Sequence, residues 1–428
     1  MTKDAKVTGS PPQADGTSAV DNTPDNAQDA SITTATTTGM RSSKGWDGKL
    51  RLPVRKAVVL ANPEALSDPE YSDDDNVVPG ELIAPDENLL DDEDPDTDEI
   101  ICTHARVHDL AALRLERFAR CRRLCLRQNS IDTLRGCTGL TALAPTLQEL
   151  DLYDNLIAHM RGVETLPHLT SLDLSFNKIR HIKHVEGLQE LTELYLVANK
   201  IGTIEGLQTS GLAATLRMLE LGSNRIRELR GLDGLTALEE LWLAKNKITS
   251  LAGLTGLPRL RLLSVQSNRI RDLAPLAAVP TLEELYVSHN ALTSLESLAA
   301  ADGTTEDAIN DATATATSTT TTSSSSSSSP TTSATILPLL RTLDIGNNQI
   351  TSLRGIEGLT QLEELWAGYN QLVDFADIER TLGDKRALET VYFEGNPLQL
   401  RAPALYRHKV RLAVPQVQQI DATYVREL

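Results

Sequence analysis

The six-residue template LxLxxN recurs eleven times between Leu124 and Asn396, with other apolar residues at one or both leucine positions in the last five copies. It constrains the fold more than any other feature of the sequence. Successive asparagines are 22 residues apart at six of the ten steps, 25 or 26 apart at three, and 58 apart at one. A fixed period of this length predicts one structural unit per copy rather than several unrelated domains. The asparagines are Asn129, Asn155, Asn177, Asn199, Asn224, Asn246, Asn268, Asn290, Asn348, Asn370 and Asn396.

Each residue of the template has a physical role. The two leucines point into a core from a short strand, and the asparagine follows where the chain bends, so that its amide can bond backbone groups of adjacent turns. A single turn cannot enclose a core, so stability has to come from stacking. A 22-residue period is typical of leucine-rich repeats. We therefore predict an α/β leucine-rich-repeat solenoid with a curved parallel sheet of about eleven to twelve turns and a cap at each end.

The formal charge is concentrated in the N-terminal part of the chain. The net charge of the chain is −18. Between Glu64 and Glu99 there are 16 Asp and Glu residues, and there is no Lys or Arg between Ala57 and Ala105. Residues 1–98 also lack an apolar period, so they cannot bury enough apolar surface to offset the entropy of ordering. We predict a disordered acidic arm over residues 1–98 and a leucine-rich-repeat domain over residues 99–428.

Two further segments depart from the regular repeat. The 58-residue step exceeds one period by 36 residues, matching a low-complexity stretch at residues 300–335. Such composition predicts a flexible Ser/Thr-rich insertion that leaves from the return path and spares the sheet; a phosphorylated tether and a neutral expansion both stay open. Cys102 to Phe118 resembles a degenerate first turn with Ala105 in place of asparagine, and residues 389–428 are predicted to form the last turn and C-terminal cap.

The residue between the two leucines alternates out of the core, so it projects from the middle of the inner face of the sheet. Five of these eleven residues are aromatic and four are acidic, although aromatic residues make up only 4% of the chain. The aromatic residues either pack against one another across turns or form an exposed site for a partner that carries Lys or Arg. We favour a binding site, extended by Glu149, Glu240, Glu284 and Glu364. The row is Cys125, Asp151, Asp173, Tyr195, Glu220, Trp242, Ser264, Tyr286, Asp344, Trp366 and Tyr392.

Other classes of function find little support. The sequence has no glycine-rich phosphate loop, HExxH, GxSxG or metal-spaced His/Cys set, so we expect no enzyme, cofactor or metal site. Asp151 and Asp173 are a candidate acid/base or cation-binding pair, but an open sheet offers no enclosing pocket. A polar start from Met1 to Gly9 and the absence of an 18-residue apolar run predict neither secretion nor membrane insertion. The acidic balance does not favour nucleic acid as a partner.

Apart from its spacing, the sequence resembles the regulatory subunit 7 family of type-1 protein phosphatase, a family of leucine-rich-repeat subunits, in the polar residues inside its repeats. The resemblance covers nearly everything from Asp98 to Arg426 except the insertion. Its most specific segments are LCLRQN ending at Asn129, ELDLYDN ending at Asn155, LELGSNRI ending at Ile226, LETVYFEGNPLQ ending at Gln399 and QIDATYVR ending at Arg426.

This resemblance implies a non-catalytic subunit whose concave face holds the phosphatase catalytic subunit away from its active site. Members bind without the short RVxF-type motif, and none is present here. Tyr195 and Trp242 stand where members often have Phe. Tyr286 completes the predicted site because it belongs to the same row. The contact positions that carry over are Asp173, Tyr195, Glu220, Trp242, Asp344, Glu364, Trp366 and Tyr392.

The resemblance also implies control of phosphatase activity, maturation or location, a link to chromosome segregation, and a ternary complex with a small inhibitor protein. We expect a monomer on its own, in the nucleus and cytoplasm. The basic cluster Arg51–Lys56 is either an import signal or a chance surface cluster. The alternative function is a nuclear leucine-rich-repeat scaffold for an RNA-binding or ribonucleoprotein partner; such proteins usually have fewer turns and lack the acidic and aromatic row.

Overall fold

The computed structural model describes residues 89–208, 211–300 and 335–425. All of them belong to the second of the two units into which the chain divides, Ile83–Leu428. The predictions for the arm up to residue 88, for the cluster Arg51–Lys56 and for the Ser/Thr insertion at residues 301–334 lie outside the described residues.

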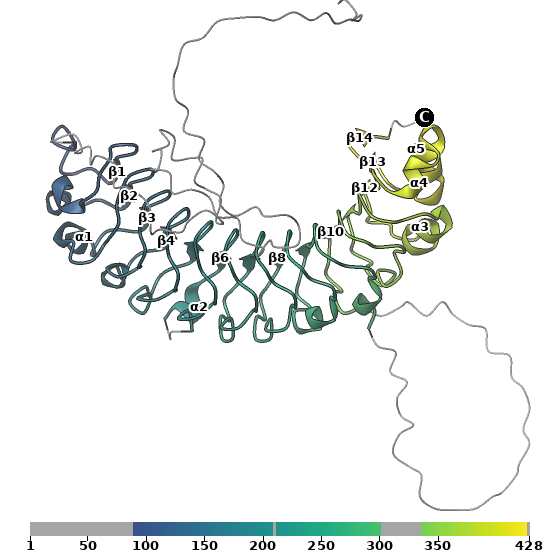
Figure 1. Cartoon of the computed structure of the whole chain (residues 1–428), viewed down its shortest axis with the longest axis horizontal. Helices are drawn as coiled ribbons and strands as arrows, with labels where there is room; N and C mark the ends of the chain where they lie inside the picture. The colour runs from purple at the N-terminus through teal and green to yellow at the C-terminus, as the bar shows by residue number, and fades with distance from the viewer. Residues whose placement is uncertain (1–88, 209–210, 301–334, 426–428) are drawn as a thin grey trace, which may run out of the picture. The chain divides into compact units, whose positions relative to one another are not determined.

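The described residues form one sheet whose strands follow one another in chain order. Strands β1 to β13 pair in parallel, and β14 pairs antiparallel with β13. Within this unit, Figure 1 shows the strands side by side along the inner edge of an arc, with the return segments on the outer side. The strands are β1 Glu99–Ile101, β2 Arg123–Cys125, β3 Glu149–Asp151, β4 Ser171–Asp173, β5 Glu193–Tyr195, β6 Met218–Glu220, β7 Glu240–Trp242, β8 Leu262–Ser264, β9 Glu284–Tyr286, β10 Thr342–Asp344, β11 Glu364–Trp366, β12 Thr390–Tyr392, β13 Gln419–Ile420 and β14 Thr423–Tyr424.

Both leucines of the template are buried, as the alternation of a strand requires. In β4 and the residue after it, for example, Leu172 and Leu174 are fully buried, while Asp173 between them is only half-buried. The leucines of successive turns join one continuous core, so each turn is stabilised by its neighbours. The predicted leucine-rich-repeat solenoid is confirmed.

The number of residues in a turn determines whether the turn contains an α-helix. Among the described residues, the α-helices before the cap fall in the three turns of 25 or 26 residues, whereas the 22-residue turns return through 3₁₀ turns or irregular segments. An α-helix rises less per residue than a 3₁₀ helix, so it accommodates the extra residues over the same span. The α-helices are α1 Thr138–Ala142, α2 Leu212–Thr215, α3 Phe375–Leu382, α4 Pro397–Leu400 and α5 Pro403–Ala413; the 3₁₀ helices are η3 Leu110–Leu113, η4 Leu115–Arg117, η5 Val163–Thr165, η6 Ala274–Ala278 and η7 Glu296–Leu298.

The asparagines form the expected ladder between turns. The side-chain amide of Asn177 donates to the carbonyl oxygens of Leu152 in the previous turn, at 2.9 Å, and of Leu174 in its own turn, at 3.1 Å. Its oxygen accepts the backbone N–H of Ile157 at 2.9 Å. Because these groups are buried, the bonds replace those that water would otherwise supply. Asn246 makes the same set of contacts three turns later.

The N-terminal end of the unit starts earlier than predicted. Strand β1 begins at Glu99 and pairs with β2, whereas the sequence pattern suggested a first turn starting at Cys102. Leu90 is buried in the core, and Arg117 donates to its carbonyl oxygen. Leu90 thus packs on the repeat unit although it precedes the predicted domain start at residue 99. The apolar pair Leu89-Leu90 stands alone among carboxylates and shows no periodicity, which is why the sequence pattern missed it.

At the C-terminal end, Asp421 directly follows β13 and caps the end of the neighbouring strand β12. Its carboxylate accepts the backbone N–H of Phe393 at 2.9 Å and the hydroxyl hydrogen of buried Tyr406 at 2.8 Å. Tyr406 belongs to α5, which packs against α3 and covers the last turn. The long step between turns does not interrupt the sheet, because β9 pairs directly with β10 and Ala299 bridges Thr335 at the base of the insertion.

Two further observations bear on the excluded classes of function. None of the helices among the described residues is long and apolar enough to cross a bilayer. The cysteines are free thiols, and burial raises the pKa of each; for Cys121 it rises to about 11.

Candidate functional site

The residues between the paired leucines fall in register in adjacent strands. Asp173 of β4 lies beside Tyr195 of β5, Tyr195 beside Glu220, and Glu220 beside Trp242. The same register continues to the C-terminal end of the sheet. We call the row of Asp173, Tyr195, Glu220, Trp242, Ser264, Tyr286, Asp344, Trp366 and Tyr392 the central row.

Glu364, the remaining predicted site residue, lies in the parallel row two residues earlier in each strand. Its carboxylate accepts the indole N–H of Trp366 at 3.2 Å. The same pairing joins Trp242 to Glu240 at 3.2 Å. Each pair belongs to a Glu-Leu-aromatic strand, in which the two outward residues are neighbours on one face.

Two tyrosines of the central row are held in the same way. The hydroxyl of Tyr286 donates to Glu284 at 2.7 Å, and that of Tyr195 donates to Glu193 at 3.3 Å. Glu193 was not among the predicted site residues, although the repeated tripeptides ELY and ELW carried the signal. Four strands thus use one glutamate each to orient one aromatic ring.

The aromatic residues also pack across turns. The rings of Trp242 and Tyr286 stack with centroids 6.3 Å apart, and Ser264, which lies between them in the row, is fully buried. Trp366 and Tyr392 are in tilted contact at 5.6 Å. Trp366 alone among these aromatic residues is classed as exposed, with 40% of its surface accessible. The expectation of exposed tryptophans and tyrosines is therefore wrong for the half-buried rings, because neighbouring turns cover them.

The negative charges of Asp173 and Glu220 in the central row are incompletely compensated by neighbouring groups of the chain. Burial, followed by the proximity of Asp151, raises the pKa of Asp173, even though its carboxylate accepts the backbone N–H of Ser175 at 2.8 Å. Burial and the charge of Asp173 also raise the pKa of Glu220. Tyr195 lies between these two carboxylates in the row, and burial together with Glu193 raises its pKa to about 12. A cation brought to these carboxylates would offset the desolvation that raises their pKa values.

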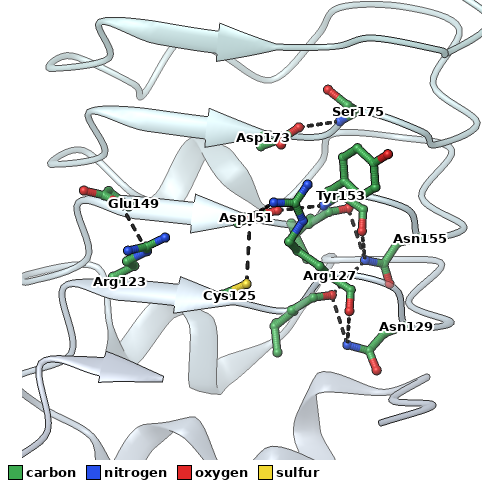
Figure 2. Close-up of polar contacts among 12 residues, drawn as sticks. Arg123, Cys125, Arg127, Asn129, Glu149, Asp151, Tyr153, Asn155, Asp173 and Ser175 are labelled. Carbon is green, nitrogen blue, oxygen red and sulfur yellow. Dashed lines mark hydrogen bonds and ion pairs between the residues drawn. The ribbon is translucent and has the colours of Figure 1, made fainter. Parts of the chain in front are cut away.

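The preceding turn, by contrast, is neutralised within the chain. In Figure 2, Arg127 extends toward Asp151, with 3.5 Å between guanidinium and carboxylate. The guanidinium also lies over the ring of Tyr153, 4.2 Å from its centroid. Cys125 contacts the same carboxylate through its thiol, at 3.8 Å. Among the residues between the paired leucines, Asp173 is therefore the first carboxylate that forms no ion pair with the described residues, one turn after Asp151.

Family models of leucine-rich repeats match the chain in three places. The model described as "Leucine Rich repeats (2 copies)" matches residues 214–256 and 338–380, and the model described as "Leucine rich repeat" matches residues 145–201. These three stretches of the chain are thus similar to leucine-rich repeats.

Curated relatives make the resemblance more specific over part of the chain. Protein phosphatase 1 regulatory subunit SDS22 of Schizosaccharomyces pombe is 57% identical over 70 residues, which are 16% of this chain and 21% of that protein. Protein phosphatase 1 regulatory subunit 7 of Mus musculus is 56% identical over 55 residues, or 13% of this chain and 14% of that protein. The matched segments thus span about a fifth or less of these relatives. They confirm the predicted resemblance to this family of regulatory subunits.

Solved structures support the fold alone. An internalin from Listeria monocytogenes superposes with a TM-score of 0.52 at 20% identity, covering 77% of this chain and 87% of the internalin. The APL1 leucine-rich repeat domain gives a TM-score of 0.52 at 19% identity, covering 72% and 70% of the two chains.

Two residues of the central row near the C-terminal end of this sheet are hydrogen-bonded within the chain. Asp344 is buried, and its carboxylate accepts the backbone N–H of Gly346 at 3.0 Å. The hydroxyl of Tyr392 accepts the side-chain amide of Gln419 at 2.8 Å. These two residues therefore shape the surface next to Trp366 more than they present free groups to a ligand.

The central row presents aromatic rings and carboxylates side by side along one face of the sheet. In the part of the chain that the structure describes, no group of three or more His, Cys, Asp or Glu side chains is arranged to hold a metal ion. A shallow cavity of about 290 Å³ lies elsewhere, lined by Arg135, Arg161, Glu164 and neighbouring residues, and no residue of the central row contributes to it. Half-buried aromatic rings with adjacent carboxylates suit the binding of a protein surface.

Proposed function

We propose that this chain is a non-catalytic regulatory subunit that binds the catalytic subunit of type-1 Ser/Thr protein phosphatase through the central row. The resemblance to regulatory subunits of protein phosphatase 1 supports the choice of partner. The observation that carries the proposed binding site is the register that places nine outward residues, rich in aromatic rings and carboxylates, along one face of the sheet.

The physical basis of binding lies in two features of the row. Asp173 and Glu220 carry charges that are partly removed from water, so a Lys or Arg of the partner would pair with them at little further desolvation cost. Trp366 presents an exposed indole, and large aromatic side chains of this kind supply much of the binding energy at protein interfaces.

The Glu-aromatic pairs prepare the row for a partner. Trp242, Tyr286 and Trp366 are each fixed by a hydrogen bond to a glutamate of the same strand. Side chains that are already ordered lose less conformational entropy on binding. We therefore expect the inner face to bind as a preformed surface, with little rearrangement of its aromatic rings.

The wider role rests on the resemblance. We include in the proposal that the chain controls the activity, maturation or location of the phosphatase in the nucleus and cytoplasm, with a part in chromosome segregation. A ternary complex with a small inhibitor protein belongs to the same proposal, as does a monomeric state in the absence of a partner.

An affinity capture from cell lysate, read by mass spectrometry, tests the choice of partner. We expect the wild-type chain to recover the phosphatase catalytic subunit and Trp366→Ala to recover much less. Tyr424→Ala is the matched control, because Tyr424 is an exposed aromatic residue of β14 outside the central row. Recovery of ribonucleoprotein subunits without phosphatase would instead support the alternative scaffold function.

A further inference from the structure

A row of basic residues runs beside the asparagine ladder over five consecutive turns. The residue that directly follows the asparagine is Lys or Arg in each of them. Its backbone N–H bonds the previous turn in every case, as Lys200 does to the carbonyl oxygen of Ile179 and Arg225 to that of Ile201, both at 2.9 Å. The five side chains therefore occupy the same position in successive turns. They are Lys178, Lys200, Arg225, Lys247 and Arg269.

Four more basic residues extend this row. Arg180, Arg227 and Arg271 stand two positions further on, and the isoleucine between the two positions is fully buried in each turn, so the residues on either side of it face away from the core. Lys245 is exposed immediately before its asparagine. We call these nine residues the basic flank. The other residues at the three positions in these turns are uncharged: Phe176, Ala198, Ser223, Ser267, Gly202 and Thr249.

The basic flank is not neutralised by the described residues. The ion pairs of these turns join other side chains: His168 with Glu190, His181 with Glu205, Arg217 with Glu239, Arg230 with Glu228 and Arg261 with Glu283. Seven of the nine basic residues are exposed, and Lys200 and Arg225 are half-buried. Adjacent turns are about 4.8 Å apart, so the like charges repel one another and create a positive local potential. An anionic ligand with closely spaced charges would relieve that repulsion.

We propose that the basic flank binds an extended, carboxylate-rich segment of a partner protein. Five turns span about 20 Å, the length of roughly six residues of extended chain. At about 0.1 M salt the Debye length is about 10 Å, so a short segment interacts with the flank rather than with the whole net charge of −18. A longer polyanion such as nucleic acid would extend beyond the flank toward acidic surfaces, which disfavours it.

The basic flank is separate from the central row. Lys247 follows the ladder asparagine of its turn, whereas Trp242 projects from the middle of the strand. The two surfaces can therefore be altered separately by substitution. The proposal does not depend on the identity of the protein that binds the central row.

Fluorescence anisotropy of a labelled peptide of about ten alternating Asp and Glu residues tests the proposal with the full chain at about 0.1 M salt. We expect Lys200→Ala, Arg225→Ala and Lys247→Ala together to weaken binding at least about tenfold. The matched control removes three exposed arginines outside the flank, Arg120→Ala, Arg386→Ala and Arg401→Ala, and should stay within about twofold of wild type. Thermal unfolding verifies that each variant folds, and the single exposed change Lys247→Glu gives a second, milder variant that should also weaken binding.

Three outcomes would overturn the assignment. The first is that the wild-type chain does not bind the peptide. The second is that the flank variants bind the peptide as tightly as the wild-type chain does. The third is that an oligothymidine of equal charge binds the wild-type chain more tightly than the peptide does and binds the flank variants more weakly. That result would assign the flank to nucleic acid.

Discussion

Individual glycines on the outer side of the solenoid are required by the closeness of adjacent turns. Gly253 has a φ of +105°, and a Cβ placed on it would lie 2.0 Å from the carbonyl oxygen of Leu229 in the preceding turn. We predict that Gly253→Ala lowers the free energy of unfolding by at least about 2 kcal/mol. Gly202→Ala is the control, since nothing lies within 4 Å of its Cβ, and it should change stability by less than about 1 kcal/mol. Urea unfolding of both variants measures the difference; equal costs would contradict the steric explanation.

The half-buried carboxylate of Asp173 gives a pH-dependent prediction. Because its pKa is raised on folding, the folded chain takes up this proton first as the pH falls, so the ionised side chain costs stability at neutral pH. Asp173→Asn should therefore raise the free energy of unfolding at pH 7, and the gain should disappear as the pH falls through the raised pKa.

Glu283 is the matched control of opposite sign. A hydrogen bond from Arg261 lowers the pKa of Glu283, so its contribution to stability is present above its unfolded pKa and is lost as the pH falls through the lowered value. Glu283→Gln should weaken the fold slightly at pH 7, since the pair is exposed. Chemical unfolding across the acid range compares the two variants, and a stabilising Glu283→Gln or a destabilising Asp173→Asn would contradict this explanation.

Residue positions were easier to predict from the sequence than residue environments. Strand alternation alone places Trp242, Ser264 and Tyr286 on one face. It does not reveal that the two rings meet over the small serine and bury it, because that contact joins strands that are not adjacent in the sheet. The same holds for Asp344, whose burial arises from packing against neighbouring turns.

At the scale of structural elements, the asparagine ladder is the repeating side-chain connection between turns and adds to the backbone hydrogen bonds of the sheet. Asn246 is buried, accepts the N–H of Ile226 and donates to the carbonyl oxygen of Leu221 at 2.9 Å. Asn246→Ala leaves the buried N–H of Ile226 without its acceptor and removes one of the two side-chain amides that donate to Leu221, the other being that of Asn224. We therefore predict a loss of about 2 kcal/mol. Thr249→Ala, an exposed change in the same turn, should cost less than about 0.5 kcal/mol. Denaturant unfolding of both proteins tests the claim, and a neutral Asn246→Ala would show that water or rearrangement replaces the ladder.

The elements show how far the repeat period can predict structure. Spacings of 25 and 26 residues coincide with α1, α2 and α3, so the length of a turn indicates its return path. The N-terminal end was less predictable, because β1 and Leu90 stabilise the first turn without the leucine and asparagine template. Terminal turns have a neighbour on one side only, and their residues therefore follow other packing requirements.

At the scale of the whole repeat unit, the charges separate onto different surfaces. The central row and its flanking glutamates are acidic and aromatic, whereas the residues after the ladder are basic over the same turns. Two surfaces of opposite charge favour different partners, because electrostatic complementarity selects the orientation in which a partner approaches. The N-terminal concentration of carboxylates had concealed this separation in the overall net charge.

The most direct test of the proposed function is a calorimetric titration of purified phosphatase catalytic subunit into the full chain. The proposed interface predicts saturable binding that Trp242→Ala and Trp366→Ala together weaken by about 30-fold or more, equivalent to at least about 2 kcal/mol. Thermal unfolding has to show that the double variant remains folded, since Trp242 also packs on Tyr286. An unchanged dissociation constant in a folded double variant, or no binding by the wild-type chain, would contradict the central row as the phosphatase-binding surface.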